Sequence, residues 1–195
     1  MISSDSETAA SVDSGAAGIK GKEFESLLLF RARKMEEAGI LTIGRYGTTV
    51  VMMNDDKGIP RWQPIPSLPD FEGVIAGSGR QIIMEAKVCS QSSYPIHQAG
   101  KAHPKQFGHM LQRAKFGASC WLVIHFNARQ LKKKGDPAAT YAIRVCAEDP
   151  LWVEFLSAER ISLSRDDAAL YGIEVQWDLY SPRASKLTPN LSFLL

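Results

Sequence analysis

The sequence lacks the features of membrane-spanning and secreted proteins. No apolar run approaches the roughly 20 residues that a helix needs to cross a bilayer. Residues Met1 to Gly18 contain no lysine or arginine and no apolar middle, which argues against a secretory signal and predicts a disordered leader. We therefore expect a cytoplasmic protein with no membrane partner, in which a single domain over residues 19–195 follows the leader.

Cysteine is scarce, and neither cysteine nor histidine shows the spacing of a metal site. The three cysteines form no CxxC pair, which argues against a disulfide framework and a zinc ribbon and favours free buried thiols. They are Cys89, Cys120 and Cys146. The four histidines fit no zinc-ligand pair on one element, and we expect most of them to lie on the surface or to contact phosphate. They are His97, His103, His109 and His125.

Acidic residues are missing from one long segment. Residues Val88 to Gly135 contain no aspartate or glutamate but eight of the 23 basic residues and all four histidines. The leader holds three acids and no base, so the rest of the chain carries a net charge of +5 although the whole chain carries +2. Such asymmetry favours a polyphosphate partner, because each neutralised phosphate releases counterions. The alternative for Lys132 to Lys134 is a solvated loop.

Hydrophobic periodicity predicts strands that alternate with helices. Helices are expected over Gly21–Glu37, His103–Gly117 and Leu151–Glu159. Strands are expected over Ile40–Met53, Phe71–Ala76, Arg80–Val88, Cys120–Phe126, Tyr141–Cys146 and Gly172–Leu179. The proline-rich segment Gly58–Pro69 predicts an extended connection without ladder pairing. This order indicates an α/β protein with a mixed central sheet flanked by helices.

The chemistry is expected beside a β-hairpin. A two-residue turn at Gly77-Ser78 would pair Ala76 with Gly79, and counting back along both strands puts Asp70 opposite Glu85. Directly opposed Cβ atoms lie ~4.5 to 5.5 Å apart, which suits two carboxylates that share a divalent cation. Lys87 falls on the same face because side chains alternate along a strand. The pattern thus predicts two acids and an amine at one place.

Like charges that face each other across a sheet repel, so folding alone would not favour this pair without a cation between the two acids. Magnesium suits the site because it binds one or two carboxylates and also accepts phosphate oxygens. Lys87 would hold the attacking water or stabilise negative charge in the transition state. The structural alternative makes Asp70 a turn residue and places Glu85 and Lys87 on an exposed strand edge.

Four blocks of sequence resemble one nuclease family in order and spacing, from about Gly18 to Phe126. They are Gly21-Lys22-Glu23-Phe24-Glu25, Asp70-Phe71-Glu72-Gly73, Met84-Glu85-Ala86-Lys87 and Gln106-Phe107-Gly108-His109-Met110. The chain is similar to the PD-(D/E)xK, or restriction-endonuclease-like, superfamily, and within it to the RecU-type Holliday junction resolvases. The resemblance implies a magnesium-dependent endodeoxyribonuclease, with manganese as a substitute metal, that cleaves branched DNA in recombination, repair or phage DNA processing.

The resemblance also implies roles for individual residues. Asp70, Glu85 and the backbone carbonyl of Ala86 would bind the metal, and Lys87 would be the catalytic amine. Glu25 would be an accessory acid near the metal; its alternative is a solvated helix charge balanced by Lys22. A catalytic glutamine of some of these nucleases matches Gln106, whose alternative is an exposed amide. The residues expected to contact DNA are Lys22, Arg45, Tyr46, Lys101, Lys105 and Arg113. The alternative for Arg45 and Tyr46 is an exposed arginine beside a half-buried tyrosine.

The sequence departs from the resolvase pattern in one place. Typical resolvases of this type carry a longer insertion before the acidic hairpin, which projects as a stalk, whereas only Asn54 to Pro69 is available here. Junction specificity is therefore less firmly indicated than nuclease chemistry. A homodimer is expected by analogy, since two cuts call for two equivalent sites. A repair or restriction-type nuclease acting on linear duplex or flaps, and a non-cutting DNA-binding modulator of recombination, stay open as alternatives.

Overall fold

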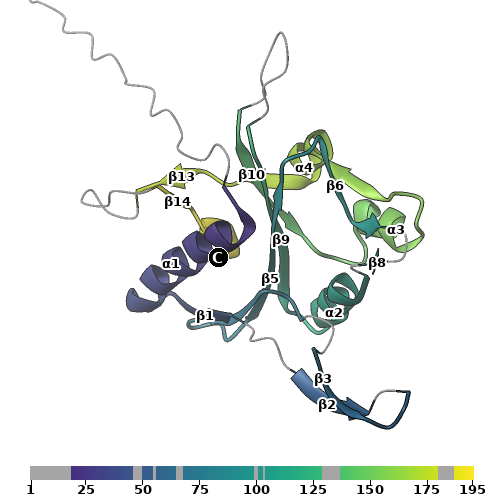
Figure 1. Cartoon of the computed structure of the whole chain (residues 1–195). Helices are drawn as coiled ribbons and strands as arrows, with labels where there is room; N and C mark the ends of the chain where they lie inside the picture. The colour runs from purple at the N-terminus through teal and green to yellow at the C-terminus, as the bar shows by residue number, and fades with distance from the viewer. Residues whose placement is uncertain are drawn as a thin grey trace, which may run out of the picture.

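The computed structural model shows a six-stranded mixed sheet with strand order β1-β4-β5-β9-β10-β12 (Figure 1). The pair β5–β9 is parallel and the other neighbours are antiparallel. The strands are β1 (Leu41–Arg45), β4 (Phe71–Ile75), β5 (Gln81–Cys89), β9 (Ser119–Phe126), β10 (Ala139–Arg144) and β12 (Gly172–Glu174). The structure describes residues 19–45, 50–54, 56–64, 68–98, 101–102, 104–128, 137–179 and 187–195, and the predicted leader lies outside these ranges.

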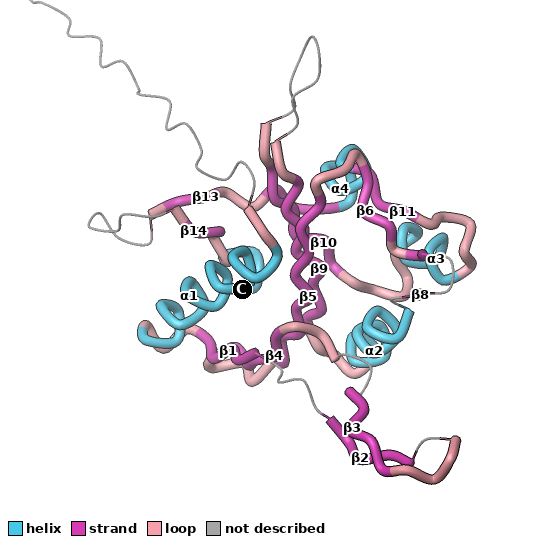
Figure 2. The backbone as a smooth tube through the Cα atoms, viewed as in Figure 1, coloured by secondary structure: helices cyan, strands magenta, loops and turns pink. Residues whose placement is uncertain are grey.

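Helices cover both faces of this sheet, as Figure 2 shows. Helix α1 (Gly21–Glu37) lies on one face, while α2 (Pro104–Lys115), α3 (Pro150–Leu156) and α4 (Arg165–Tyr171) lie on the other. The predicted mixed sheet flanked by helices is confirmed, and α1 has the predicted bounds. The core is therefore divided by the sheet into an α1-side cluster and an α2-side cluster.

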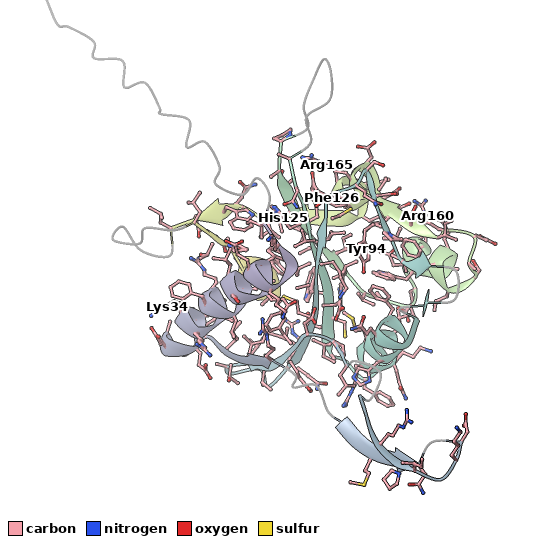
Figure 3. The ribbon with its side chains drawn as sticks, in the orientation of Figure 1. Lys34, Tyr94, His125, Phe126, Arg160 and Arg165 are labelled. Atoms are coloured by element: carbon pink, nitrogen blue, oxygen red, sulfur yellow. The ribbon has the colours of Figure 1, made fainter. Side chains whose placement is uncertain are left out.

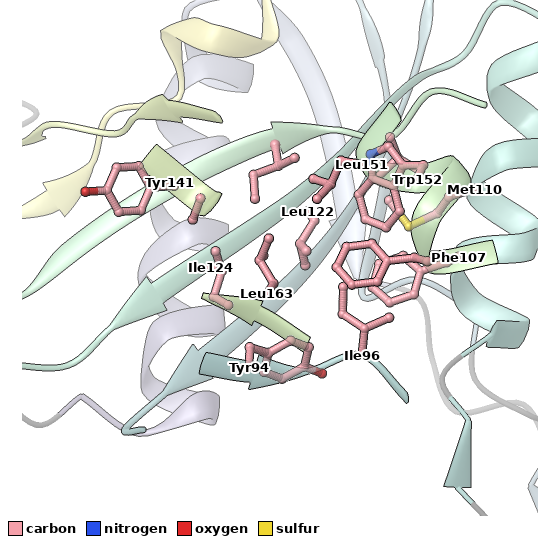
Figure 4. Packing of buried hydrophobic residues seen from close by; sticks show 14 of the residues in the cluster. Tyr94, Ile96, Phe107, Met110, Leu122, Ile124, Tyr141, Leu151, Trp152 and Leu163 are labelled. Carbon is pink, nitrogen blue, oxygen red and sulfur yellow. The ribbon is translucent and has the colours of Figure 1, made fainter. Parts of the chain in front are cut away.

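The α2-side cluster joins three helices and a small strand pair to the sheet. Strands β6 (Ser93–Pro95) and β11 (Ser162–Ser164) form that pair (Figure 4). The Trp152 ring is 1% exposed and lies 5.1 Å from the ring of Phe107, and its indole N–H donates to the carbonyl of Arg144 at 2.7 Å. Because the polar atom of the indole is satisfied, the whole side chain can be buried and can hold α3 against α2.

The α1-side cluster includes the end of the chain. Strands β13 (Trp177–Asp178) and β14 (Thr188–Pro189) pair beside α1, and a short 3-10 turn (Ser192–Leu194) follows. An ion pair of 3.0 Å joins Arg31 of α1 to Asp178. These contacts hold the C-terminal segment against the face of the sheet that α1 covers.

The predicted strand Ile40–Met53 and the predicted extended connection Gly58–Pro69 were wrong in part. The first divides into β1 and a separate strand β2 (Val50–Asn54), which pairs with β3 (Pro60–Pro64) in a hairpin that projects from the sheet (Figure 1). In a two-stranded ribbon every strand is an edge, and the two prolines stand at the ends of β3. The ladder therefore tolerates them.

The C-terminal third also differs from the prediction. The expected strand Gly172–Leu179 divides into β12 and β13, which belong to different sheets. Helix α4, of seven residues, was not predicted; Ser164 caps it, in a capping box with Asp167. Two further two-residue strands, β7 (His97–Gln98) and β8 (Lys101–Ala102), pair with each other. None of the described helices is long and apolar enough to cross a membrane.

The expectation of a surface or phosphate-contacting role was wrong for His125. Its side chain is fully buried on β9, where its Nδ1 lies 2.8 Å from the hydroxyl oxygen of Thr140. The centre of its ring lies 5.5 Å from the ring centres of Phe24 and Trp177. Figure 3 shows His125 on the α1 side of the sheet. All three cysteines are free thiols as predicted, but Cys146 is partly exposed rather than buried.

Candidate active site

The β4–β5 hairpin has the predicted register. Phe71 lies opposite Met84, and one step further this register puts Asp70 opposite Glu85. Gly77 and Gly79 both have positive φ values, of 78° and 67°, which glycine adopts without the steric cost that other residues have. The turn chemistry therefore fixes the pairing that brings the two acids together.

Asp70, Glu85 and Lys87 form an interlocked acid–amine cluster. The backbone N–H of Asp70 donates to Glu85 Oε2 at 3.1 Å, and the backbone N–H of Ala86 donates to Asp70 Oδ2 at 2.8 Å. Lys87 Nζ contacts Glu85 Oε1 and lies 3.9 Å from Asp70 Oδ2. The structure thus brings these three predicted residues together, and the ammonium group lies between the two carboxylates.

The two acids differ in burial. The side chain of Glu85 is fully buried, whereas those of Asp70 and Lys87 are 24% and 20% exposed. Burial raises the pKa of Glu85 to about 7, against the opposing charge of Lys87. Burial alone would lower the pKa of Lys87, but the charges of Glu85 and Asp70 raise it above its usual value. Lys87 is therefore a cation at neutral pH. The alternative that placed Glu85 on an exposed strand edge is wrong, because its side chain is buried.

The raised pKa of Glu85 predicts a pH dependence of folding in the absence of metal. Between pH 4.5 and about 7 the folded state holds more protons on Glu85 than the unfolded state does, so its contribution to stability falls as the pH rises. We expect the ionisation of Glu85 to reduce the free energy of unfolding of wild type by about 1 to 3 kcal/mol, and Glu85→Gln to abolish this reduction. Thermal unfolding of wild type and Glu85→Gln in EDTA between pH 5 and 8 measures the difference.

The comparison of wild type with Glu85→Gln isolates this effect from other titrating groups. Burial lowers the pKa of His109, which gives stability the opposite pH slope, but both proteins share that histidine. The melting temperature of the variant should rise relative to wild type as the pH increases. A constant difference across the range would contradict the assignment.

Tyr94 is a neighbour of this cluster that the sequence analysis missed. It lies on β6 in the α2-side cluster, opposite Leu163 of β11, and is 9% exposed (Figure 3). Burial raises its pKa to about 12, and the charges of Lys87 and Glu85 also act on it. Tyr94 belongs to no sequence motif, and the residues between Lys87 and Tyr94 match no pattern that would link the two side chains. Its hydroxyl stays neutral and able to donate.

The donor set of the cluster fits a hard divalent cation. Two carboxylates on adjacent strands, one of them partly open to solvent, are the ligands that magnesium takes from proteins while it keeps waters and substrate oxygens. The ammonium group of Lys87 shows that the position favours positive charge. Among the described residues there is no group of three or more His, Cys, Asp or Glu that could hold a metal. Asp70 and Glu85 are the two acids of the cluster that could hold a metal.

Glu25 is not brought into the acid–amine cluster. Its carboxylate accepts a hydrogen bond of 2.8 Å from Arg45, whose guanidinium carbon lies 6.0 Å from the centre of the Phe71 ring. Phe71 belongs to the α1-side cluster, whereas the neighbours of Glu85 along β5 place its side chain on the α2 side. Glu25 is balanced by Arg45 rather than by Lys22, and its role as an accessory ligand stays a prediction.

Gln106 lies on the same side of the sheet as the acid–amine cluster. It is the third residue of α2 and is only 5% exposed, so the alternative of an ordinary exposed amide is wrong. The predicted position of Gln106 near the site and its catalytic role stay predictions. Ala86 contributes its N–H to Asp70, while metal binding by its carbonyl stays a prediction.

The residues predicted to contact DNA are distributed over several elements. Lys22 and Arg113 are exposed, on α1 and α2, and Arg45 is 43% exposed at the end of β1. Tyr46 lies outside the described residues, and the side chains of Lys101 and Lys105 are likewise not described. Their contacts with DNA stay predictions.

The comparison with known proteins found likenesses only among solved structures, and the one described here is distant. No protein-family model matches the chain, and neither does any curated protein. Among solved structures, the chain is similar to a Holliday junction resolvase from Archaeoglobus fulgidus, an archaeal hyperthermophile, with 16% sequence identity and a TM-score of 0.43. The match covers 79% of this chain and 95% of the resolvase. The roles of the residues rest on the geometry of this chain rather than on that likeness.

Proposed function

We propose that this protein is a magnesium-dependent endodeoxyribonuclease that cleaves branched DNA, with four-way Holliday junctions as its preferred substrate. The observation that carries the proposal is the convergence of Asp70, Glu85 and Lys87 on one face of the β4–β5 hairpin. Two carboxylates that can hold a metal, with a cation beside them, suit metal-assisted phosphodiester hydrolysis. The resemblance of the sequence to resolvases supports the choice of DNA.

The residues of the cluster would divide the work. Asp70 and Glu85 would hold the cation, which when bound polarises the phosphate and lowers the pKa of bound water. Lys87 keeps its proton on Nζ, because its pKa is raised, so it would donate a hydrogen bond to a phosphate oxygen and stabilise developing negative charge. The backbone N–H of Ala86 holds the Asp70 carboxylate in place before substrate arrives.

The substrate and the assembly belong to the same proposal. Four-way junctions need two coordinated cuts, which a twofold homodimer would supply with two equivalent sites. The basic segment Val88–Gly135 would attract the phosphate backbone. Manganese would replace magnesium, since both ions accept oxygen ligands. No small-molecule cofactor is part of this chemistry.

The deciding experiment uses end-labelled DNA of different geometries. Four-way junction, flap and linear duplex are incubated with the purified full chain, with and without magnesium. We expect cleavage of the junction only with the metal, and much slower cleavage of linear duplex. Cleavage of linear duplex at the same rate would favour a restriction-type or repair nuclease. Binding without cleavage in magnesium or manganese would contradict the enzyme and favour a DNA-binding modulator.

A further inference from the structure

Four residues of α2 and its C-terminal turn lie along one line. Gln106, His109, Arg113 and Phe116 follow each other at intervals of three, four and three residues, which places them on one side of a helix. Phe116 continues the line beyond the helix because its N–H donates to the carbonyl of Arg113 at 3.0 Å. The buried residues Phe107, Met110 and Leu111 occupy a different face. We call the four residues the α2 stripe.

The α2 stripe and the side chains of Glu72 and Val74 of strand β4 lie on the same side of the sheet, because Phe71 and Ile75 of β4 belong to the α1-side cluster and side chains alternate along a strand. The carboxylate of Glu72, two residues after Asp70, raises the pKa of His109, although burial and the charge of Arg113 lower it overall. Glu72 itself is held by a hydrogen bond from Gln81. Further along the same face of β4, Val74 is 40% exposed. This face of β4 is therefore partly open next to the stripe.

The stripe also continues from the candidate active site. Helix α2 connects the parallel strands β5 and β9, so it runs antiparallel to both. Phe116 precedes Ser119, which pairs with Ile82 near the start of β5. An antiparallel α2 would therefore put Gln106, ten residues before Phe116, towards the part of β5 that carries Glu85 and Lys87. With a rise of 1.5 Å per residue, the stripe extends about 15 Å away from the acid–amine cluster.

The chemistry of the stripe suits a nucleic-acid strand. Helix α2 contains no acidic residue and has Arg113 and Lys115 in its last turn. Phe116 is 84% exposed, the most exposed of the large hydrophobic side chains of the described residues. Arg113 is exposed as well. A cation and an open aromatic face match a phosphate and an unstacked base.

We propose that the α2 stripe binds an unpaired DNA strand next to the scissile phosphate, with Phe116 stacking on a base and Arg113 binding a phosphate. This inference rests on the proposed nuclease function for its biological meaning, but it concerns binding alone. Base pairs in a duplex keep their faces stacked, so Phe116 can reach a base only where the strands separate, as they do at a branch point or in a tail. The stripe would thereby favour branched DNA over continuous duplex.

The test measures binding in EDTA, where metal-dependent cleavage does not occur. Fluorescence anisotropy compares a blunt duplex with the same duplex carrying a short single-stranded tail of either polarity. We expect Phe116→Ala to weaken binding of tailed DNA at least about fivefold, with little change for blunt duplex, and Phe116→Trp to retain the affinity. Phe30→Ala is the matched control, since Phe30 is a partly exposed aromatic residue on α1, across the sheet.

Salt dependence distinguishes the two contacts. Arg113→Ala should reduce the slope of log affinity against log salt concentration by about 0.7 for tailed DNA, as expected for one lost phosphate contact with a single strand. Phe116→Ala should leave that slope unchanged, because stacking neutralises no phosphate. A fluorescent adenine analogue in the tail should be quenched by wild type and by Phe116→Trp but not by Phe116→Ala.

Equal affinities of Phe116→Ala and Phe30→Ala for tailed DNA would overturn the inference. A wild type that binds tailed and blunt DNA equally would also overturn it. Tail binding that depends on Phe116 in a protein that cuts no DNA with magnesium or manganese would uphold the α2 stripe and reject the nuclease function. If Phe116→Ala left both DNA cleavage and tail binding unchanged, the nuclease function would be upheld and the α2 stripe rejected.

Discussion

Replacing Asp70 by asparagine is expected to reduce magnesium-dependent cleavage of a four-way junction about 10³-fold or more. The substitution removes one of the two carboxylates that would hold the cation, and a bound cation contributes several kcal/mol of transition-state stabilisation. The fold should survive, because the amide oxygen of asparagine can still accept the hydrogen bond that the N–H of Ala86 donates at 2.8 Å. Single-turnover cleavage of labelled junction measures the loss, and circular dichroism checks the fold.

Binding provides the control for this prediction. Junction affinity in EDTA should change little in Asp70→Asn, since the side chain is only 24% exposed. Removing its negative charge adds no repulsion between the protein and the DNA phosphates. Asp166→Asn is the matched variant, because Asp166 is an exposed aspartate on α4 at a distance in sequence from the hairpin. It should cleave like wild type. Unchanged cleavage by Asp70→Asn would reject the assignment of the active site.

The acid–amine cluster could be predicted because it depends on local rules. A turn of Gly77 and Ser78 determines which residues of β4 and β5 are opposed, and the alternation of a strand determines which share a face. Counting along the sequence therefore found Asp70, Glu85 and Lys87. The burial of Glu85 could not be counted in this way, because burial depends on how elements distant in the sequence pack together.

Long-range packing explains most of what the sequence did not reveal. Tyr94 comes to the cluster because β6 pairs with β11, a strand nearly 70 residues later. His125 has the ordinary sequence context of a buried strand, and only the packing of α1 and Trp177 shows that it is part of the core. The hairpin β2–β3 was missed because prolines argue against ladder pairing in general but are tolerated at the ends of an edge strand.

The close approach of strands β4 and β1 depends on one glycine. Strand β4 carries Gly73 three residues after Asp70, directly opposite Ile43 of β1. A Cβ atom on Gly73 would overlap the carbonyl oxygen of Thr42 and lie 2.7 Å from Cα and 2.9 Å from Cβ of Ile43. Real Cβ contacts are longer than this, and the obstructing atoms are mostly backbone. Strand β1 would have to move away from β4.

We expect Gly73→Ala to destabilise the protein by about 3 kcal/mol, the upper end of the usual cost of overpacking. For a chain of this length that corresponds to a fall in melting temperature of about 6 to 12 °C. The rate of DNA cleavage should also decrease at temperatures where the variant is still folded, because β4 holds Asp70 in its register with Glu85.

Gly44→Ala provides the matched control for Gly73→Ala. Gly44 is the exposed glycine of the neighbouring strand β1, where an added Cβ meets no atom within 4 Å. Its melting temperature should stay near wild type, since surface substitutions of this kind usually change stability by less than about 0.5 kcal/mol. If the two alanine variants melted at the same temperature, the close approach of β1 and β4 at Gly73 would be wrong. If only Gly73→Ala lost both stability and cleavage, the register of β4 would be tied to the chemistry at Asp70.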